Sequence, residues 1–191
     1  MQEDKYISFM KKCLSEKRIA HSFRVANTAT YLAKLYNVSE EMVYIAGILH
    51  DVGKGVSPTE TITMLNKNKY QLTEDDLQVP EVLHAPLSAI IANQDLGISN
   101  SAILQAITRH TTGDKAMTVM DAIIYVADMI EPFRDYPGVQ ELRKSAENDL
   151  YTALVTCLGH TIKYLVSKGK IIHPRTIQTY NWLLQSKKLQ A

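Results

Sequence analysis

The sequence predicts an all-α protein, a helical bundle of roughly nine or ten helices that forms one domain over residues 1–191. Apolar residues recur at intervals of three and four along most of the chain, as on the buried stripe of an amphipathic helix. No segment alternates convincingly with the period of two that marks a strand. Residues typical of helix starts and ends, such as Ser39 and Gly97, separate the periodic segments.

The first third of the chain is expected to form three helices. An apolar stripe from Tyr6 to Cys13 indicates a short amphipathic helix. The second helix is expected over residues 17–36, with Asn37 as a left-handed stop. The third follows the Ser39 cap and is almost wholly apolar over residues 43–49.

The rest of the chain carries further start and stop signals. Ser57 and Glu60 form a capping box around Pro58, Thr73 opens a short turn, and Pro80 and Pro86 break the region around His84 into short pieces. Further helices are expected at 58–65, 87–96, 99–110, 118–131, 147–167 and from Pro174 onward.

The composition limits the class of protein. With 46% hydrophobic and 21% charged residues, the chain is typical of a globular protein. A formal net charge of +1 gives no basic footprint, so we expect no nucleic-acid partner. Cys13 and Cys157 are isolated, which indicates neither a disulfide framework nor a thiolate metal site. Without a signal peptide or a run long enough to span a bilayer, we expect a cytoplasmic protein with no membrane partner.

His50 and Asp51 are the first candidate ligands, because they end an apolar helix and emerge inside the protein. Burying them unpaired would cost several kcal/mol, and a metal ion is one way to satisfy them. Adjacent helical side chains diverge by about 100°, so one can bind an ion while the other bridges to a second. Gly53 is expected to stop the helix, and Lys54 to place a cation beside the site.

Further candidates lie in or beside other predicted helices: His21, His84, His110 and Asp128. This sulfur-free set suits iron, manganese, zinc or nickel. Six ligands exceed the needs of one tetrahedral site and favour two metal ions, between which a water can ionise and attack phosphorus. The polar turn Thr111-Thr112-Gly113 is expected to offer hydroxyl and N–H groups to a phosphate.

The order of these residues resembles the HD-domain metal-dependent phosphohydrolase superfamily, and longer motifs resemble its YqeK-type bacterial branch, the symmetrical diadenosine tetraphosphate hydrolases. The likeness covers almost the whole chain, and Met129 stands where an aromatic residue is expected. The motifs are Arg18-x-x-His21-Ser22, His50-Asp51-Val52-Gly53-Lys54, Leu83-His84-Ala85, Arg109-His110-Thr111-Thr112-Gly113, Tyr125-Val126-Ala127-Asp128-Met129-Ile130-Glu131-Pro132, Arg134, Tyr136-Pro137-Gly138-Val139 and Ile172-His173-Pro174-x-Thr176.

The resemblance implies a role for each matching residue. One iron would be held by His21, His50, Asp51 and Asp128, and Asp51 would bridge to a second ion held by His84 and His110. Asp51 and Lys54 would be the catalytic pair, with Lys54 on the nucleophile or a phosphate oxygen. The residues implied in substrate binding are Arg18, His84, Arg109, His110, Thr111, Arg134 and His173.

The activity that the resemblance implies is hydrolysis of diadenosine tetraphosphate by a metal-activated water, with ADP as the product of both halves. One alternative keeps the chemistry with another nucleotide as substrate: a nucleoside mono- or triphosphate, a guanosine alarmone or a cyclic dinucleotide. Another is a regulatory module that binds nucleotide without turnover. A homodimer is compatible with the sequence.

Each site residue also has a purely structural interpretation. His50 and Asp51 could be a hydrogen-bonded pair at a helix end, and His84 and His110 could be satisfied core residues. Arg134 could lie free on the surface, and His173 before Pro174 could simply open the last helix. His160, in the middle of a helix, is read as structural.

Overall fold

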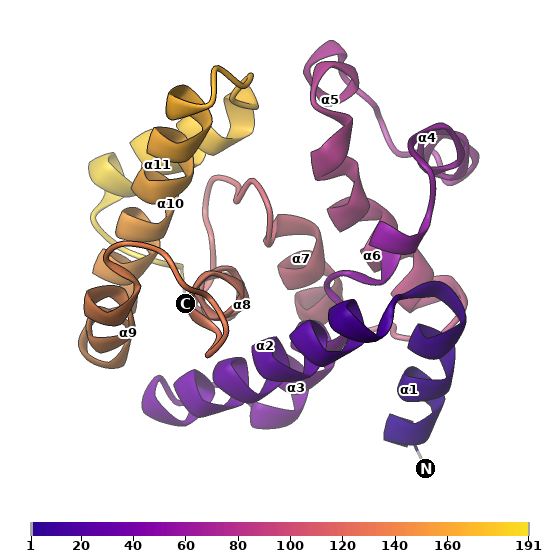
Figure 1. Ribbon diagram of the computed structural model, residues 1–191, viewed down its shortest axis with the longest axis horizontal. Helices are drawn as coiled ribbons and strands as arrows, with labels where there is room; N and C mark the ends of the chain where they lie inside the picture. The colour runs from indigo at the N-terminus through magenta and orange to yellow at the C-terminus, as the bar shows by residue number, and fades with distance from the viewer. Residues whose placement is uncertain (1, 191) are drawn as a thin grey trace.

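The computed structural model describes residues 2–190, which fold into eleven α-helices and two 3₁₀ helices, η1 and η2 (Figure 1). The only β-type pairing among these residues is an isolated bridge between Thr118 and Gln190, so the all-α prediction is confirmed. The helices are α1 (Gln2–Cys13), α2 (Glu16–Leu35), α3 (Glu40–Leu49), η1 (Val52–Gly55), α4 (Pro58–Lys67), α5 (Glu74–Gln78), η2 (Pro80–Leu83), α6 (His84–Gln94), α7 (Ser101–Arg109), α8 (Val119–Ile130), α9 (Val139–Asn148), α10 (Leu150–Ser167) and α11 (Pro174–Ser186).

Helices α2, α3 and α8 form the centre of the bundle. α2 packs along α3 at close range because Gly47 has no side chain; a Cβ there would lie 2.7 Å from the Ala26 Cα. α8 is buried around most of its circumference, which explains why its sequence is apolar on all sides. Polar residues at the ends of these helices therefore emerge deep inside the protein.

Two groups of helices flank α8. α9, α10 and α11 lie on one side of it, and α4, α5 and α6 lie on the other (Figure 1). α10 packs directly on α8, and α6 packs on α7 and on η1, so both groups join the central core. None of the described helices is long and apolar enough to cross a membrane.

The C-terminal half differs from the sequence expectation in two respects. Residues 139–148 form α9, a helix that the sequence analysis did not predict. Instead of one helix over residues 147–167, α9 ends at Asn148 and α10 begins at Leu150. Asp149 between them is extended, with φ −149°, and its Oδ1 accepts the N–H of Thr152 at 3.1 Å. A capping residue inside a run that reads as continuous helix therefore turns the chain.

Helix boundaries elsewhere shift by smaller amounts. Asn100, rather than Ser99, caps α7, because its side chain accepts the N–H groups of Ala102 and Ile103. Pro86 does not interrupt the helix as expected. It lies in the first turn of α6, where a backbone N–H would have no hydrogen-bond partner within the helix. Asn37 has the left-handed φ of 54° expected of a helix stop.

Candidate metal centre

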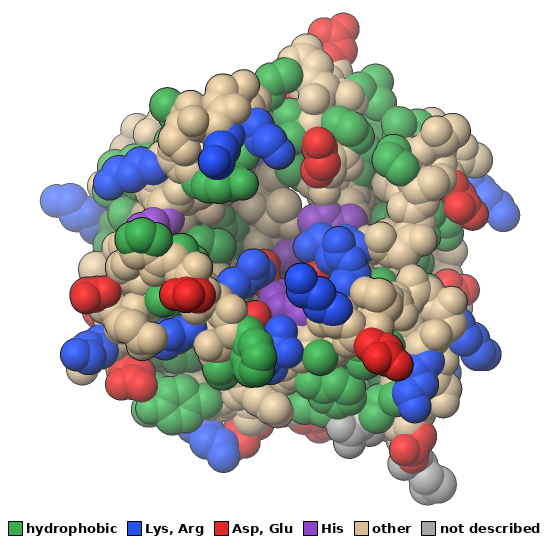
Figure 2. All heavy atoms as spheres, in the orientation of Figure 1, with side chains coloured by type: hydrophobic (Ala, Val, Ile, Leu, Met, Phe, Trp, Pro, Cys, Tyr) green, Lys and Arg blue, Asp and Glu red, His purple; other side chains and the backbone are tan. Residues whose placement is uncertain are grey.

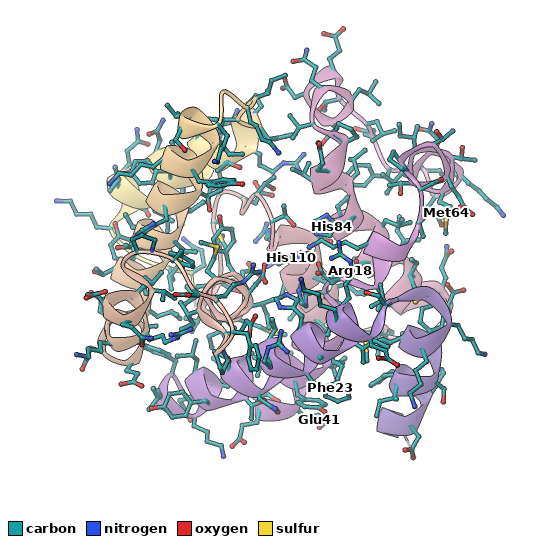
Figure 3. All side chains as sticks on the ribbon, viewed as in Figure 1. Arg18, Phe23, Glu41, Met64, His84 and His110 are labelled. Atoms are coloured by element: carbon teal, nitrogen blue, oxygen red, sulfur yellow. The ribbon has the colours of Figure 1, made fainter. Side chains whose placement is uncertain are left out.

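Five helices deliver the predicted ligands to one place. His21 comes from α2, His50 and Asp51 from the end of α3, His84 from the start of α6, His110 from the end of α7 and Asp128 from α8. Figure 3 shows His84 and His110 close together in the middle of the molecule, with Arg18 beside them. Two groups among the described residues have donor atoms within 4.8 Å of one another and could hold a metal ion: His21, His50 and Asp51, and Asp51, His84 and His110.

Asp51 belongs to both groups and is completely buried. Its Oδ1 lies 3.5 Å from the Nε2 of His50, 3.4 Å from that of His84 and 3.5 Å from that of His110. These separations exceed those of good hydrogen bonds. Three imidazole nitrogens thus surround one carboxylate oxygen at separations expected between atoms that bind the same metal ion.

The other ring nitrogens define how these histidines face the centre. The Nδ1 atoms of His50, His84 and His110 lie 2.6–2.7 Å from the carbonyl oxygens of Gly47, Glu81 and Ile107. A carbonyl only accepts, so each Nδ1 carries the proton and each Nε2 has its lone pair toward Asp51.

Several donor atoms in the cluster lack a partner, which is what a cation-binding site requires. His50 Nε2 and Asp51 Oδ1 are buried without a hydrogen bond to any of residues 2–190. The Nε2 atoms of His84 and His110 are 3.0 Å apart, although both present lone pairs, and the Thr111 hydroxyl near them can donate to only one at a time. The cluster therefore fits a metal ion, with nitrogen and oxygen donors that suit a first-row transition metal.

Electrostatics keep the donors in their ligating forms. Burial lowers the pKa of His50 to about 4 and also lowers the pKa of His84, so both rings are neutral near pH 7. Burial acts to raise the pKa of Asp51, but neighbouring groups, among them the Lys54 ammonium, outweigh it and hold that pKa well below its usual range. The centre thus combines neutral imidazoles with an ionised carboxylate.

Asp128 and His21 form the edge of the cluster. The Asp128 Oδ1 lies 2.9 Å from the His21 Nε2 and 2.5 Å from the Arg134 Nη2. The Arg134 Nε also donates to the Asp128 backbone carbonyl at 2.8 Å. Burial opposes ionisation of Asp128, but His21, His50 and Arg134 outweigh it and lower its pKa. Arg134 is thus tied to a candidate ligand, whereas the sequence placed it only on phosphate.

Cationic side chains surround the open side of the centre. The Lys54 Nζ lies 2.9 Å from the Asp51 Oδ2, and the Arg18 Nη1 lies 3.6 Å from the same oxygen. Figure 2 shows lysine and arginine side chains gathered around histidine at the hollowed middle of this face. The side chains of Arg18 and Arg134 are 45% and 38% exposed, so an anion from solvent can reach them.

Gly53 does not stop α3, contrary to the expectation from the sequence. The chain passes through His50 and Asp51 into η1, which contains Gly53. Its Cα must come close to α6, because a Cβ would lie 2.6 Å from the carbonyl oxygen of His84. The Gly53 N–H also donates to the buried Ser88 hydroxyl at 2.9 Å. Gly53 thus holds Asp51 and Lys54 against the helix that carries His84.

A cleft of about 340 Å³ adjoins the centre. Thr111 and Glu81 connect it to the histidines, and α10 and the segment before α11 form its far wall. His173 lines this cleft and also caps α11, because its Nδ1 accepts the N–H of Arg175. His173 therefore lies where it could contact a ligand in the cleft, and it also opens the last helix.

Arg109 is the predicted site residue that the structure does not bring to the cluster. Its Nη1 donates to the Asp121 Oδ2 at 2.8 Å, and its Nη2 faces Asp114 at 3.6 Å. At the end of α7, its side chain reaches the capping box of α8 rather than the cleft. His160 likewise lies outside the cluster, with its ring 5.5 Å from that of Tyr136.

Sequence reasoning gave no role to Glu131 and Arg24. The Glu131 Oε1 lies 3.2 Å from the His21 Nδ1, and its Oε2 accepts from the Arg24 Nε at 2.6 Å. The signal was present in the spacing, because Glu131 follows Asp128 by three residues and Arg24 follows His21 by three. Residues three apart share a helix face, so these pairs meet where α2 and α8 touch.

Comparison with known proteins identifies the family. Residues 18–132 match the family described as the HD domain. The chain is 37% identical to the "Bis(5'-nucleosyl)-tetraphosphatase, symmetrical" of Halalkalibacterium halodurans over 98% of this chain and 100% of that protein. It is 37% identical to the Bacillus subtilis protein of the same name over 96% and 98% of the two chains.

A solved structure has the same fold. It is the crystal structure of a "predicted HD superfamily hydrolase involved in NAD metabolism" from Clostridium acetobutylicum, with a TM-score of 0.94 and 39% identity, covering 97% of this chain and 98% of that one. The matched span contains every histidine and aspartate of the cluster described above. The chain therefore belongs to the HD-domain hydrolase family, as its motifs predicted.

Proposed function

We propose that the protein is a metal-dependent hydrolase that cleaves diadenosine tetraphosphate symmetrically into two ADP. The observation that carries this proposal is the sharing of Asp51 by two groups of metal donors beside the cationic side chains of Lys54 and Arg18. The full-length relatives named symmetrical bis(5'-nucleosyl)-tetraphosphatase supply the substrate class. We further propose that residues 1–191 act as one HD-type domain in the cytoplasm, without a nucleic-acid or membrane partner.

The proposed ligands follow the two donor groups. His21, His50, Asp51 and Asp128 would hold one ion, which we propose to be iron, and His84 and His110 would hold a second that shares Asp51 with the first. Manganese, zinc or nickel would also accept these donors. When bound, the ions lower the pKa of water and polarise phosphoryl oxygens.

The protein side chains then position the substrate. Lys54 and Arg18, which line a hollow together with His84 beside the metal centre, neutralise phosphate charge, and Thr111 offers a hydroxyl beside the histidines. Since 340 Å³ is near the lower limit for ligand pockets, the cleft admits one nucleotide half. That half would extend from the donors toward His173 and leave the central phosphates at the metal centre.

The direct test is to measure metal content by mass spectrometry and then to identify products by chromatography. With diadenosine tetraphosphate we expect ADP alone, and a mixture of ATP and AMP would contradict the symmetrical cut. Lys54→Gln should slow turnover, whereas Lys12→Gln, which changes an exposed lysine on α1, is the matched control.

A second candidate substrate is a nucleoside triphosphate. The chain is 26% identical over 147 residues to a deoxyguanosinetriphosphate triphosphohydrolase-like protein of Caldanaerobacter subterraneus, covering 41% of that protein. Deoxyguanosine triphosphate, a guanosine alarmone and a cyclic dinucleotide therefore belong in the same assay. Faster turnover of any of these would replace the proposed substrate, and metal and nucleotide binding without turnover would indicate a regulatory module.

A further inference from the structure

His21 is held differently from the other histidines of the cluster. It is the sixth residue of the 20-residue helix α2, where backbone carbonyls are occupied by the N–H groups of the helix itself. Within the described part of the chain, its Nδ1 therefore has no backbone carbonyl as partner, whereas those of His50, His84 and His110 do. Its Nδ1 instead faces the Oε1 of Glu131 at 3.2 Å.

Glu131 is fixed from three directions. Its side chain is only 3% exposed. Its Oε2 accepts the Phe133 N–H at 2.9 Å and the Arg24 Nε at 2.6 Å, while its Oε1 faces His21 and also accepts from the Arg24 Nη2 at 3.5 Å. The Arg24 guanidinium is itself held over the Phe133 ring, with its Cζ 4.3 Å from the centroid.

We propose that Glu131, fixed by Arg24, is the positioning residue that holds His21 as a metal ligand. This inference rests on the proposed metal centre. A carboxylate that accepts the Nδ1 proton leaves the Nε2 lone pair for the ion that His21 and Asp128 would share, and makes that nitrogen a stronger donor. Glu131 therefore acts on the metal through His21 without touching it.

A purely structural role for Glu131 predicts a different result, and the chain offers a matched control. Asp121, near the other end of α8, is also buried and pairs with one arginine, Arg109, at 2.8 Å. It accepts one backbone N–H, from Thr118 at 3.0 Å, as Glu131 accepts that of Phe133. Asp121 lies in the capping box of α8, and among the described residues its side chain bonds to Thr118, Gln105 and Arg109, none of which is a candidate ligand.

The experiment is a titration of the metal-free protein with Co²⁺, followed by its visible spectrum and by competition with a chelator. We expect Glu131→Gln to weaken Co²⁺ binding by about 10- to 100-fold and to shift the visible bands, which report the ligand field. Asp121→Asn should lower the unfolding temperature but leave affinity within about twofold. Equal effects of the two variants on Co²⁺ affinity would overturn the proposal.

A double-mutant cycle separates positioning from general destabilisation. In a His21→Ala background, Glu131→Gln should weaken Co²⁺ binding no further, because the residue through which it acts is gone. If Glu131→Gln does not fold, Arg24→Met replaces it and should weaken binding less, since the carboxylate remains. A wild-type protein that binds no Co²⁺ would refute the metal centre itself, whereas tight binding that Glu131→Gln leaves unchanged would refute only this inference.

Discussion

Three of the four histidines in the candidate metal centre directly follow a helix, and this position explains how each ring is held. His50, His84 and His110 are the C-caps of α3, η2 and α7. The last carbonyls of a helix lack N–H partners, so each ring donates its Nδ1 proton to the residue three before it. The same bond that completes a helix end therefore aims a lone pair at Asp51.

Asp51→Asn is expected to abolish metal binding at both donor groups, because its carboxylate belongs to each. An amide is a weaker ligand than a carboxylate. We expect activity to fall more than about 100-fold, which exceeds the loss typical when a residue that only hydrogen-bonds a ligand is changed. Mass spectrometry of the purified variant checks the metal content, with Asp95→Asn on the exposed end of α6 as control. Full metal content in Asp51→Asn would disprove the bridging role.

Arg18→Gln and Arg134→Gln are expected to separate substrate binding from metal binding. The Arg18 Nη1 lies 3.6 Å from the Asp51 Oδ2, which places its half-exposed guanidinium where a substrate phosphate would bind. Its loss should raise KM about 10-fold or more, as for a lost charged hydrogen bond, and should leave the metal content unchanged. Arg134 makes two close contacts with Asp128, so its loss should weaken metal binding as well. Unchanged metal affinity in Arg134→Gln would return this arginine to a role on phosphate alone.

At the scale of elements, the sequence predicted periodic helices and their caps well, but not contacts between helices. The caps at Ser39, Ser57 and Thr118 are local, because each accepts an N–H three residues ahead, and the structure has all three. The sequence analysis missed α9 and began the next helix at residue 147, before the break at Asp149, because the apolar period continues across that residue. A local pattern of apolar residues is compatible both with one long helix and with two shorter helices, and only packing in the core decides between them.

The site divides in the same way. The His50-Asp51 pair and the other candidate ligands were readable, because their chemistry is rare in apolar helices and their order matches a family. The partners of Glu131 and Arg109 depend on which helices touch, so the sequence left the first unassigned and placed the second on substrate. From the sequence alone, Gly53 is typical of a helix stop. Only the structure shows that it is a glycine because the backbone of α6 lies so close to it.

Asp76 joins two elements on opposite sides of the cleft. It is completely buried; its Oδ2 accepts the Thr73 N–H at 3.0 Å, and its Oδ1 lies 3.1 Å from the His173 Nε2. It thereby ties the start of α5 to the start of α11. Since hydrogen bonds to a charged group contribute about 1.5–3 kcal/mol, Asp76→Asn should lower the free energy of unfolding by about 2 kcal/mol.

This effect should depend on pH in one direction. Burial opposes ionisation of Asp76, but its bonds to Thr73, Arg175 and His173 outweigh burial and lower its pKa below the ordinary value. Stability from such a group is complete above the unfolded pKa, about 3.9, and is lost as pH falls through the folded pKa. Denaturant unfolding should therefore show a constant difference from Asp76→Asn above about pH 5 that shrinks below about pH 4. A difference that grows in acid would contradict this assignment.

At the scale of the molecule, the metal donors and the cleft wall come from different parts of the chain. Every candidate ligand lies within residues 18–132, the span that matches the HD domain. Much of the far wall of the cleft comes from residues 161–176, in α10 and at the start of α11. The candidate ligands thus come from helices within the HD-domain span, and the C-terminal helices supply much of the far wall of the cleft, where we expect differences in substrate choice to arise.

Removal of the metal is expected to destabilise the whole protein, because α2, α3, α6, α7 and α8 meet at the donor cluster. A ligand that binds only the folded state, present at 100 times its Kd, stabilises it by about 2.7 kcal/mol. For a protein of this size, about 1 kcal/mol corresponds to roughly 2–4 °C, so chelation should lower the unfolding temperature by about 5–11 °C. Calorimetry with and without chelator measures this shift, and Asp51→Asn, which cannot hold the ions, should unfold at the same temperature in both conditions. A shift of equal size in that variant would mean that the chelator acts elsewhere on the chain.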